Sequence, residues 1–253
     1  MEVLSPFTIT GLIISAQSSS LTARLPQGSV GDLCWIGTRD RGDLAAQIVS
    51  FNEDVFSLAL FDDPDGIIPG ARVKTKGTQL KIPVGDELLG RVISPLGIPL
   101  DGKLASSATQ HRSINSKPPP ASGRPPIDTP LNTGVKAIDS LCTIGKGQRV
   151  GVFASAGVGK STLLAMIARE AQIDVIVVAL VGERGREVQE FIDETLGADG
   201  LRRSVIVVAT SDDSSLTRQT APFTATAIAE HFRDQGKDVL LIIDSLTHGA
   251  RHS

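Results

Sequence analysis

The sequence predicts an α/β protein in which a small β-barrel-like domain precedes an open α/β domain. Short strand-like runs separated by turn residues fill 1–102, and a proline-rich stretch covers 103–130. From 131 to 253, apolar runs alternate with segments of helical periodicity. The first pattern is typical of a barrel or sandwich, and the last is typical of a mainly parallel sheet covered by helices.

Strands are predicted in the N-terminal part from its apolar and β-branched runs, which include Leu44–Phe51, Val55–Phe61 and Leu88–Ile93. Asp65-Gly66 and Pro69-Gly70 are examples of the turn pairs that separate such runs. Because these pairs favour tight turns, residues 1–102 are expected to form a compact all-β unit.

Prolines distinguish the connector, and they stand at Pro118, Pro119, Pro120, Pro125, Pro126 and Pro130. Proline lacks a backbone N–H and clashes with the preceding helical turn, so this stretch cannot be helical throughout. We therefore predict an extended connector over 103–130.

The C-terminal part predicts alternating strands and helices. The strands are expected at Arg149–Phe153, Ile173–Val181, Ser204–Ala209 and Val239–Ile243, and the helices at Lys160–Ala171, Gly185–Leu196 and Thr217–Gln235. Nearly continuous apolar strands indicate a parallel sheet that is buried on both faces. In such sheets, ligands bind at the carboxyl ends of the strands.

Composition narrows the class of function. The net charge is −3, and the chain has one Trp, eight Phe and no Tyr, which disfavours a nucleic-acid-binding surface. The two distant cysteines, Cys34 and Cys142, indicate reduced thiols in a cytoplasmic protein. No basic residue precedes the apolar run Phe7–Ile14, and no run approaches the ~18 residues of a membrane span, so neither a secretory leader nor a transmembrane helix is expected.

The most specific motif lies between a predicted strand and a predicted helix and reads Ala154-Ser155-Ala156-Gly157-Val158-Gly159-Lys160-Ser161-Thr162. Glycines let successive backbone N–H groups converge on anionic oxygens, and the helix N-terminus adds positive potential. Lys160 is expected to reach the outer phosphates of a nucleoside triphosphate, and Ser161 to bind Mg²⁺. Ala154 stands where the strict pattern has glycine, and the alternative interpretation is a helix-capping turn with a solvated Lys160.

Two acidic residues follow predicted buried strands. Asp244 ends the apolar run Val239–Ile243 and is expected to hold Mg²⁺, whereas the alternative is an aspartate that caps a turn. Glu183 follows Ile173–Val181 at the same edge of the sheet. A carboxylate there can position the attacking water in line with the γ-phosphate.

Charged neighbours of Glu183 extend this prediction. Arg184 and Arg186 are expected to neutralise nearby charge, and Glu187 to hold a Mg²⁺-bound water. The alternative for Glu187 is an acidic residue favoured by the dipole of the first helical turn.

Together these motifs resemble the flagellar and type III secretion ATPases of bacteria, which are related to the catalytic β subunit of rotary ATP synthases. The matching stretches are Leu89–Val92, Leu96–Gly102, Pro130–Asp139, Phe153–Ser161, Gly182–Glu187, Val207–Asp212, Thr224–Glu230 and Asp244–Thr247. The loop pair Ser155-Ala156 and the run Ala225–Gly236 are more similar to the secretion branch than to ATP synthase. Between injectisome and flagellar ATPases, the injectisome is favoured.

The resemblance implies a fold, residue roles and partners. The fold is an N-terminal β-barrel-like domain followed by a RecA-like P-loop domain, here incomplete at its C-terminus. ATP and Mg²⁺ are implied, with Lys160 and Glu183 catalytic beside Arg184, and with Ser161, Glu187 and Asp244 near the metal. A homohexamer is implied at the cytoplasmic face of the inner membrane, peripherally associated with export-gate, stator and chaperone–cargo proteins and not with nucleic acid. There it would release chaperones and unfold cargo.

The sequence departs from the family near its end. The family continues well beyond Ser253, and it usually has Arg-Phe where His248-Gly249 stand. The further part is expected to supply sheet strands, an adenine-packing aromatic residue, an arginine finger and a helical domain.

An arginine finger contributes about 10³–10⁵ in rate in other triphosphatases. We therefore predict that this chain alone is a weak or inactive ATPase. Steady-state phosphate release measures this, and turnover within roughly tenfold of a full-length relative would contradict it.

Three other functions remain open from the sequence. An ion-translocating ATP synthase subunit would co-purify with a rotary stalk and an ion-channel ring. A non-catalytic interaction module would keep its phenotype after loss of Lys160. A nucleic-acid motor would bind single strands in a salt-sensitive way, which the acidic composition disfavours.

Overall fold

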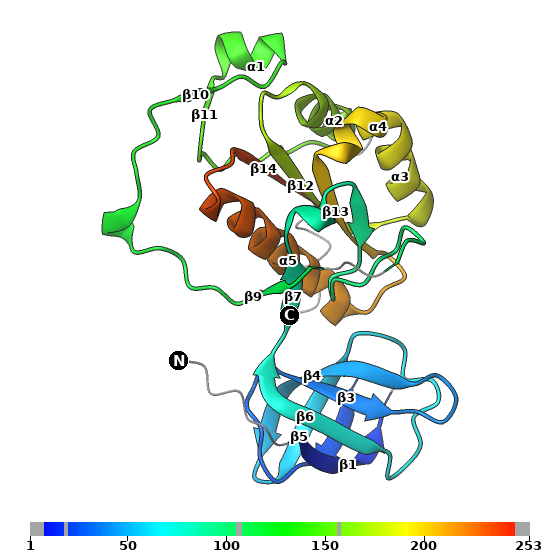
Figure 1. Ribbon diagram of the computed structural model, residues 1–253. Coiled ribbons are helices and arrows are strands. Elements are labelled where there is room, and N and C mark those ends of the chain that lie inside the picture. The colour runs from blue at the N-terminus through cyan, green and yellow to red at the C-terminus, as the bar shows by residue number, and fades with distance from the viewer. Residues whose placement is uncertain (1–7, 18–19, 105–107, 156–157, 246–253) are drawn as a thin grey trace.

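The computed structural model describes residues 8–17, 20–104, 108–155 and 158–245. A β-barrel and an α/β unit lie next to one another, and the chain passes from the barrel through β7 into the α/β unit (Figure 1). The departure at His248-Gly249 lies outside the described residues. Within the described ranges, no helix is both long and apolar enough to cross a bilayer.

The barrel contains six antiparallel strands, closed in the order β1-β2-β5-β4-β3-β6. Their bounds are β1 Ile9–Ala16, β2 Leu21–Arg24, β3 Asp32–Gly37, β4 Asp43–Asn52, β5 Val55–Leu60 and β6 Arg72–Gln79. Side chains alternate between the barrel interior and its surface, as in β5, where Phe56, Leu58 and Leu60 are buried. The predicted strands Leu44–Phe51 and Val55–Phe61 are confirmed as β4 and β5.

The α/β unit has a parallel sheet in the order β14-β12-β13-β8. The strands are β8 Arg91–Ile93, β12 Val175–Glu183, β13 Ser204–Thr210 and β14 Val239–Asp244. The strand predicted at Leu88–Ile93 was expected in the N-terminal β unit, and that placement is wrong. Pairing of β6 with β1 already closes the barrel, so β8 pairs with β13 instead.

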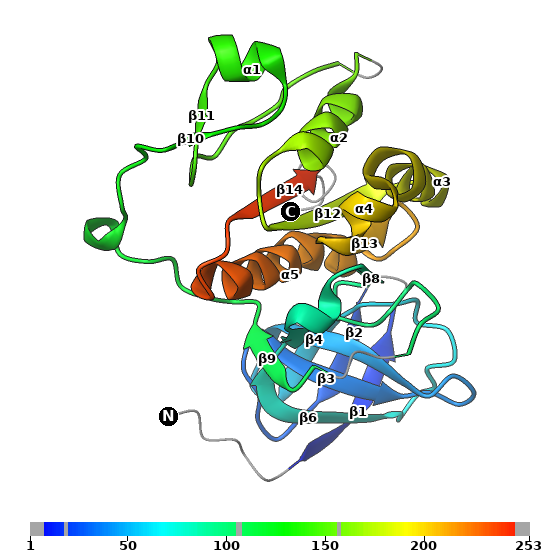
Figure 2. The same ribbon diagram turned by 45° about the horizontal axis from the view of Figure 1, so that its top comes forward.

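Helices cover both faces of this sheet (Figure 2). These helices are α2 Lys160–Glu170, α3 Gly185–Glu190, α4 Gly197–Arg202 and α5 Ser215–Asp234, with a π-helical turn η3 at Phe191–Leu196 that continues α3. The short helix α1 Lys136–Leu141 has no buried side chain. One face, including Val177 and Val207, packs on α5, and the other, including Val178 and Ile206, packs on α2, α3 and η3. The continuous apolar run of β12 is therefore explained by burial on both faces.

The predicted strand at Arg149–Phe153 is wrong, because these residues pair with no strand in the described part of the chain. Phe153 is 95% exposed. A strand is stable only where its backbone finds a partner edge and its apolar side chains find cover. The sheet ends at β14, whose Leu241 and Ile243 are themselves only half-buried.

The described part of the proline-rich connector is mostly exposed and extended, and it includes one short strand and one 3-10 turn. Residues Gln110–Ser113 form β9, which pairs antiparallel with β7 (Lys81–Val84). The remaining short elements are the 3-10 turns η1 Asp86–Leu88 and η2 Ala121–Gly123, and the strand pair β10 Pro130–Leu131 with β11 Ile144–Gly145.

The barrel is attached to the α/β unit through α5. Phe61, at the end of β5, is 6% exposed and belongs to the same apolar cluster as Ala225 and Phe232 of α5. Beside it, Thr217 Oγ1 donates a hydrogen bond of 2.6 Å to the carbonyl of Phe61, and Ser214 Oγ donates one of 2.9 Å to that of Leu60. The interface thus combines apolar burial with directional hydrogen bonds.

Phe61→Ala is expected to lower the free energy of unfolding by about 3 kcal/mol, because it leaves a cavity in this shared core. Urea denaturation followed by circular dichroism measures the loss. Phe223→Ala is the matched control: its ring is 55% exposed, and its cost should stay within about 0.5 kcal/mol. An equal loss of unfolding free energy in the two variants would contradict the role of Phe61 in the interface between the barrel and α5.

Candidate functional site

The candidate site lies at the carboxyl ends of β12 and β14, beside the N-terminus of α2. The two strands are parallel neighbours in which Leu180 is paired with Asp244. Helix α2 begins at Lys160 after Gly159, whose φ of 96° lies in the left-handed region. Glycine adopts that conformation without steric cost, which allows the loop to turn directly into the helix.

Lys160 and Asp244 form the central ion pair of the site. Lys160 Nζ lies 2.6 Å from Asp244 Oδ1, and the side chains are 29% and 7% exposed, respectively. A buried carboxylate needs a partner, because removing its charge from water is costly. The ammonium at the start of α2 supplies that partner, so the two motifs predicted from sequence meet.

Glu183 reaches the same edge through a bulge in β12. The register with β13 shifts between Val181 and Glu183, and Gly182 has a φ of 77°. Burial, a hydrogen bond with Glu187 and the negative charge of Asp244 raise the pKa of Glu183 to about 7, and Lys160 acts in the opposite direction. At neutral pH, Glu183 is therefore poised between its protonated and ionised forms.

Glu187 is the acceptor in this carboxyl pair. The hydrogen bond from Glu183, the Arg184 backbone N–H at 3.4 Å from its Oε2, and the charges of Arg184 and Arg186 lower the pKa of Glu187. The Arg184 guanidinium lies 4.0 Å from Glu187 Oε1. Below about pH 7 a proton shared by the pair therefore resides on Glu183, and the negative charge resides on Glu187.

The remaining predicted residues are more open. Ser161 and Thr162 lie exposed in the first turn of α2, and Val158 is 66% exposed. Ala156 and Gly157 lie outside the described residues. The described residues contain no group of three or more His, Cys, Asp or Glu side chains arranged to hold a metal.

Sequence reasoning missed Arg218, which lies in the first turn of α5. Its Nη1 donates a hydrogen bond of 3.2 Å to the carbonyl of Ser211, whose N–H donates one of 3.0 Å to the carbonyl of Glu183. The Nε of Arg218 is buried without a hydrogen-bond partner in the described structure. A cation in the first turn of a helix is unfavourable because it opposes the helix dipole. This unusual position was the signal in the sequence that could have drawn attention to Arg218.

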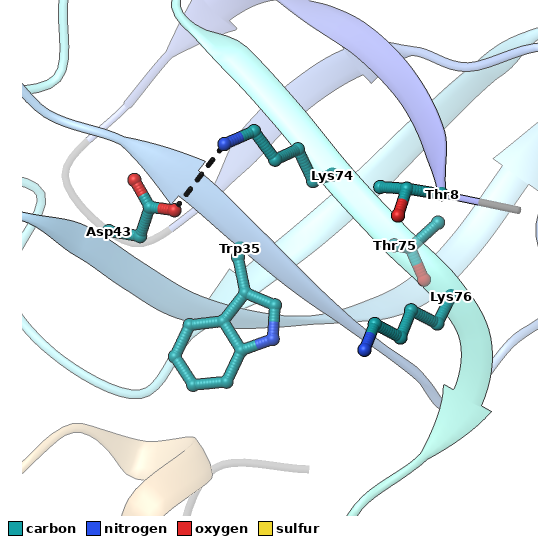
Figure 3. Close-up of a pocket in the computed structure, with 6 residues that line it drawn as sticks. All are labelled: Thr8, Trp35, Asp43, Lys74, Thr75 and Lys76. Carbon is teal, nitrogen blue, oxygen red and sulfur yellow. Dashed lines mark ion pairs between the residues drawn. The ribbon is translucent and has the colours of Figure 1, made fainter.

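The pocket found on the barrel lies elsewhere, on the outer side of β3 and β6. It has a volume of about 160 Å³ and is lined by Thr8, Trp35, Asp43, Lys74, Thr75 and Lys76 (Figure 3). Lys74 forms an ion pair of 3.8 Å with Asp43 there. None of the residues predicted for phosphate binding or catalysis lines it.

Comparison with known proteins supports the resemblance seen in the sequence. Residues 134–252 match the ATP synthase alpha/beta family, nucleotide-binding domain. The chain is 46% identical to the flagellum-specific ATP synthase of Bacillus subtilis over 96% of its own length and 54% of the relative. It is 48% identical to the type 3 secretion system ATPase of Xanthomonas euvesicatoria, over 95% of its own length and 55% of the relative.

A solved structure agrees with these relatives. The ATPase EscN in complex with its central stalk EscO, from the type III secretion system of enteropathogenic E. coli, superposes with a TM-score of 0.88 at 45% identity. The match covers 95% of this chain and 59% of EscN, so the chain spans little more than half the length of the proteins it matches. The predicted barrel followed by a RecA-like P-loop domain is confirmed. The chain is therefore similar to flagellar and type III secretion ATPases over little more than half of their length, and its residues 134–252 match the nucleotide-binding domain of the ATP synthase alpha/beta family.

Proposed function

We propose that this chain is the nucleotide-binding part of an ATP-hydrolysing subunit that energises type III protein secretion. The observation that carries the proposal is the meeting of Lys160, Asp244 and Glu183 at one edge of a parallel sheet. The relatives named as type 3 secretion ATPases support the biological role. An ion-translocating ATP synthase is not favoured, because EscN, with which the chain superposes at 45% identity, comes from a type III secretion system.

In this proposal, ATP binds at the loop and first turn of α2. Backbone N–H groups of 156–162 hold the phosphates, and Lys160 exchanges its contact with Asp244 for contact with the outer phosphates. The positive end of the α2 dipole favours the same anions. Arg184, exposed beside the carboxyl pair, would balance charge near the γ-phosphate.

The oxygen-rich set at this edge fits Mg²⁺. Ser161, Glu187 and Asp244 offer a hydroxyl and two carboxylates, the ligand type that Mg²⁺ prefers. Mg²⁺ is usually bound through one or two protein oxygens with waters and substrate phosphates, so a preformed cage is not required. When bound, the ion would neutralise charge on the phosphates.

Glu183 is proposed to orient the attacking water and accept its proton. Only the ionised carboxylate can do so, and the hydrogen bond to Glu187 keeps part of the population protonated at neutral pH. Its raised pKa suits a general base, since proton transfer is efficient when the base titrates near the working pH.

The assembly is proposed by analogy with the solved relative. EscN is described as assembled and as bound to a central stalk, EscO. We infer that this protein forms a homohexameric ring that contacts a stalk or stator, the export gate and chaperone–cargo proteins. The location that we propose is the cytoplasm, peripherally at the inner membrane. The acidic net charge disfavours nucleic acid as a partner.

Lys160→Ala is expected to abolish binding of a fluorescent ATP analogue in the presence of Mg²⁺, because it removes the phosphate-contacting ammonium. Fluorescence anisotropy measures binding. Lys136→Ala, an exposed lysine on α1, is the matched control and should bind as the wild type does. Equal binding by both variants, or no binding by the wild type, would refute the proposed site.

The proton on Glu183 should be visible as a carboxyl group that titrates near pH 7 in infrared difference spectra and is absent from Glu183→Gln. The folded protein retains this proton between about pH 4.5 and 7, whereas the unfolded chain has released it. Relative to Glu183→Gln, wild-type stability should therefore fall as pH rises through this window. A stability difference between the wild type and Glu183→Gln that does not change from about pH 4.5 to 7 would contradict the proton on Glu183.

A further inference from the structure

Arg203, which follows α4, is bonded to the C-terminal end of α2. Its guanidinium donates four hydrogen bonds: Nη1 to the carbonyls of Ala171 at 3.2 Å and Ile173 at 2.9 Å, and Nη2 to those of Ala168 at 3.2 Å and Arg169 at 2.8 Å. The last carbonyls of a helix have no partner within the helix. One side chain therefore bonds to the carbonyls of Ala168 and Arg169 in the last turn of α2 and to that of the C-cap residue Ala171, and its positive charge is favourable at the negative end of the helix dipole.

The backbone of Arg203 is itself fixed in the sheet. Its carbonyl accepts a hydrogen bond of 2.9 Å from the N–H of Ile176 in β12. The next residue, Ser204, begins β13, and its buried hydroxyl donates a bond of 2.6 Å to the carbonyl of Gly200. The guanidinium thus extends from a backbone position that is fixed at the start of β13 by its hydrogen bond to β12.

A second segment approaches the same end of α2. A Cβ added at Gly134 would lie 2.3 Å from the Cβ of Glu170, and the N–H of Gln172 donates a bond of 3.2 Å to the carbonyl of Asn132. This close approach limits outward movement of the helix end but supplies a single hydrogen bond to it. Arg203 bonds to Ala168 and Arg169 within α2 and to the C-cap residue Ala171, so it is the larger directional constraint on this helix end.

At its other end, α2 carries Lys160, which faces Asp244. The eleven-residue helix is about 16 Å long, so it is held at two distant points. Between them, Ala165, Ile167 and Ala168 pack by apolar contact, which is non-directional and tolerates small sliding movements. Hydrogen bonds, in contrast, weaken steeply with misalignment.

We propose that Arg203 is a positioning residue that sets the place of α2 along the sheet and thereby holds Lys160 in register with Asp244. The inference rests on the proposed nucleotide site. Arg203 touches neither nucleotide nor catalytic carboxylates, and it acts through the helix.

The test compares Arg203→Met and Arg203→Lys with Arg202→Met. Arg202 is the matched control, because its 79% exposed side chain pairs with Asp199 alone among the interactions described. Titration with a fluorescent ATP analogue and Mg²⁺ gives both Kd and the number of sites per chain. Losing these charge-assisted bonds should raise Kd roughly tenfold in Arg203→Met, and less in Arg203→Lys, with the number of sites unchanged.

A purely structural helix cap would behave differently. It would lower the number of sites per chain through partial unfolding while leaving Kd of the folded fraction unchanged, and this result would overturn the proposal. An unchanged Kd with an unchanged number of sites would also overturn it. Arg203→Lys keeps the charge and is the variant to interpret if Arg203→Met does not fold.

Hydrogen exchange of the nucleotide-free protein separates this inference from the proposed function. Faster exchange at the Leu163 amide, which bonds to the carbonyl of Gly159, in Arg203→Lys than in Arg202→Met would support positioning even if the wild type bound no nucleotide. Equal exchange in the two variants would overturn the positioning role. Absence of wild-type binding alone would instead refute the nucleotide site.

Discussion

Burial of β12 on both faces is the constraint on which the α/β unit depends. Every residue from Val175 to Val181 is buried, with alternate side chains in the two apolar cores. Such a strand is stable only between two other strands and two helical layers. Its pairing with β13 and β14 then determines which residues meet at the carboxyl edge, because parallel register carries all three strand ends to one side.

The carboxyl edge of the sheet concentrates negative charge around the buried carboxylate of Asp244. Asp244 is buried, and Glu183 and Glu187 share a hydrogen bond. Two devices relieve the repulsion: the ammonium of Lys160 and a proton retained on Glu183. Both would be released when anionic phosphates and a divalent cation bind, so the electrostatics of the site suit the charges of the proposed ligand.

Helix α5 connects this edge with the barrel. Thr217 bonds to the end of β5, and Arg218, the next residue, contacts Ser211, which is bonded to the backbone of Glu183. Adjacent residues in the first turn of α5 thus contact the barrel and the segment that bonds to Glu183. Small residues such as Ala221 and Ala225 let the same helix lie close to the sheet.

The sequence was sufficient to predict the buried strands β12, β13 and β14, because continuous apolar runs report directly on strand burial. It also predicted the phosphate loop with Lys160 and the acidic residues Glu183 and Asp244 from glycine spacing and from position after a strand. Tertiary pairing, in contrast, was needed to place Leu88–Ile93 in the α/β sheet and Arg149–Phe153 outside it. Strand propensity reports that a segment can pair, whereas the edge it joins depends on residues far away in the chain. The proton on Glu183 and the bonds of Arg203 to α2 depend in the same way on distances between remote elements, which no local pattern encodes.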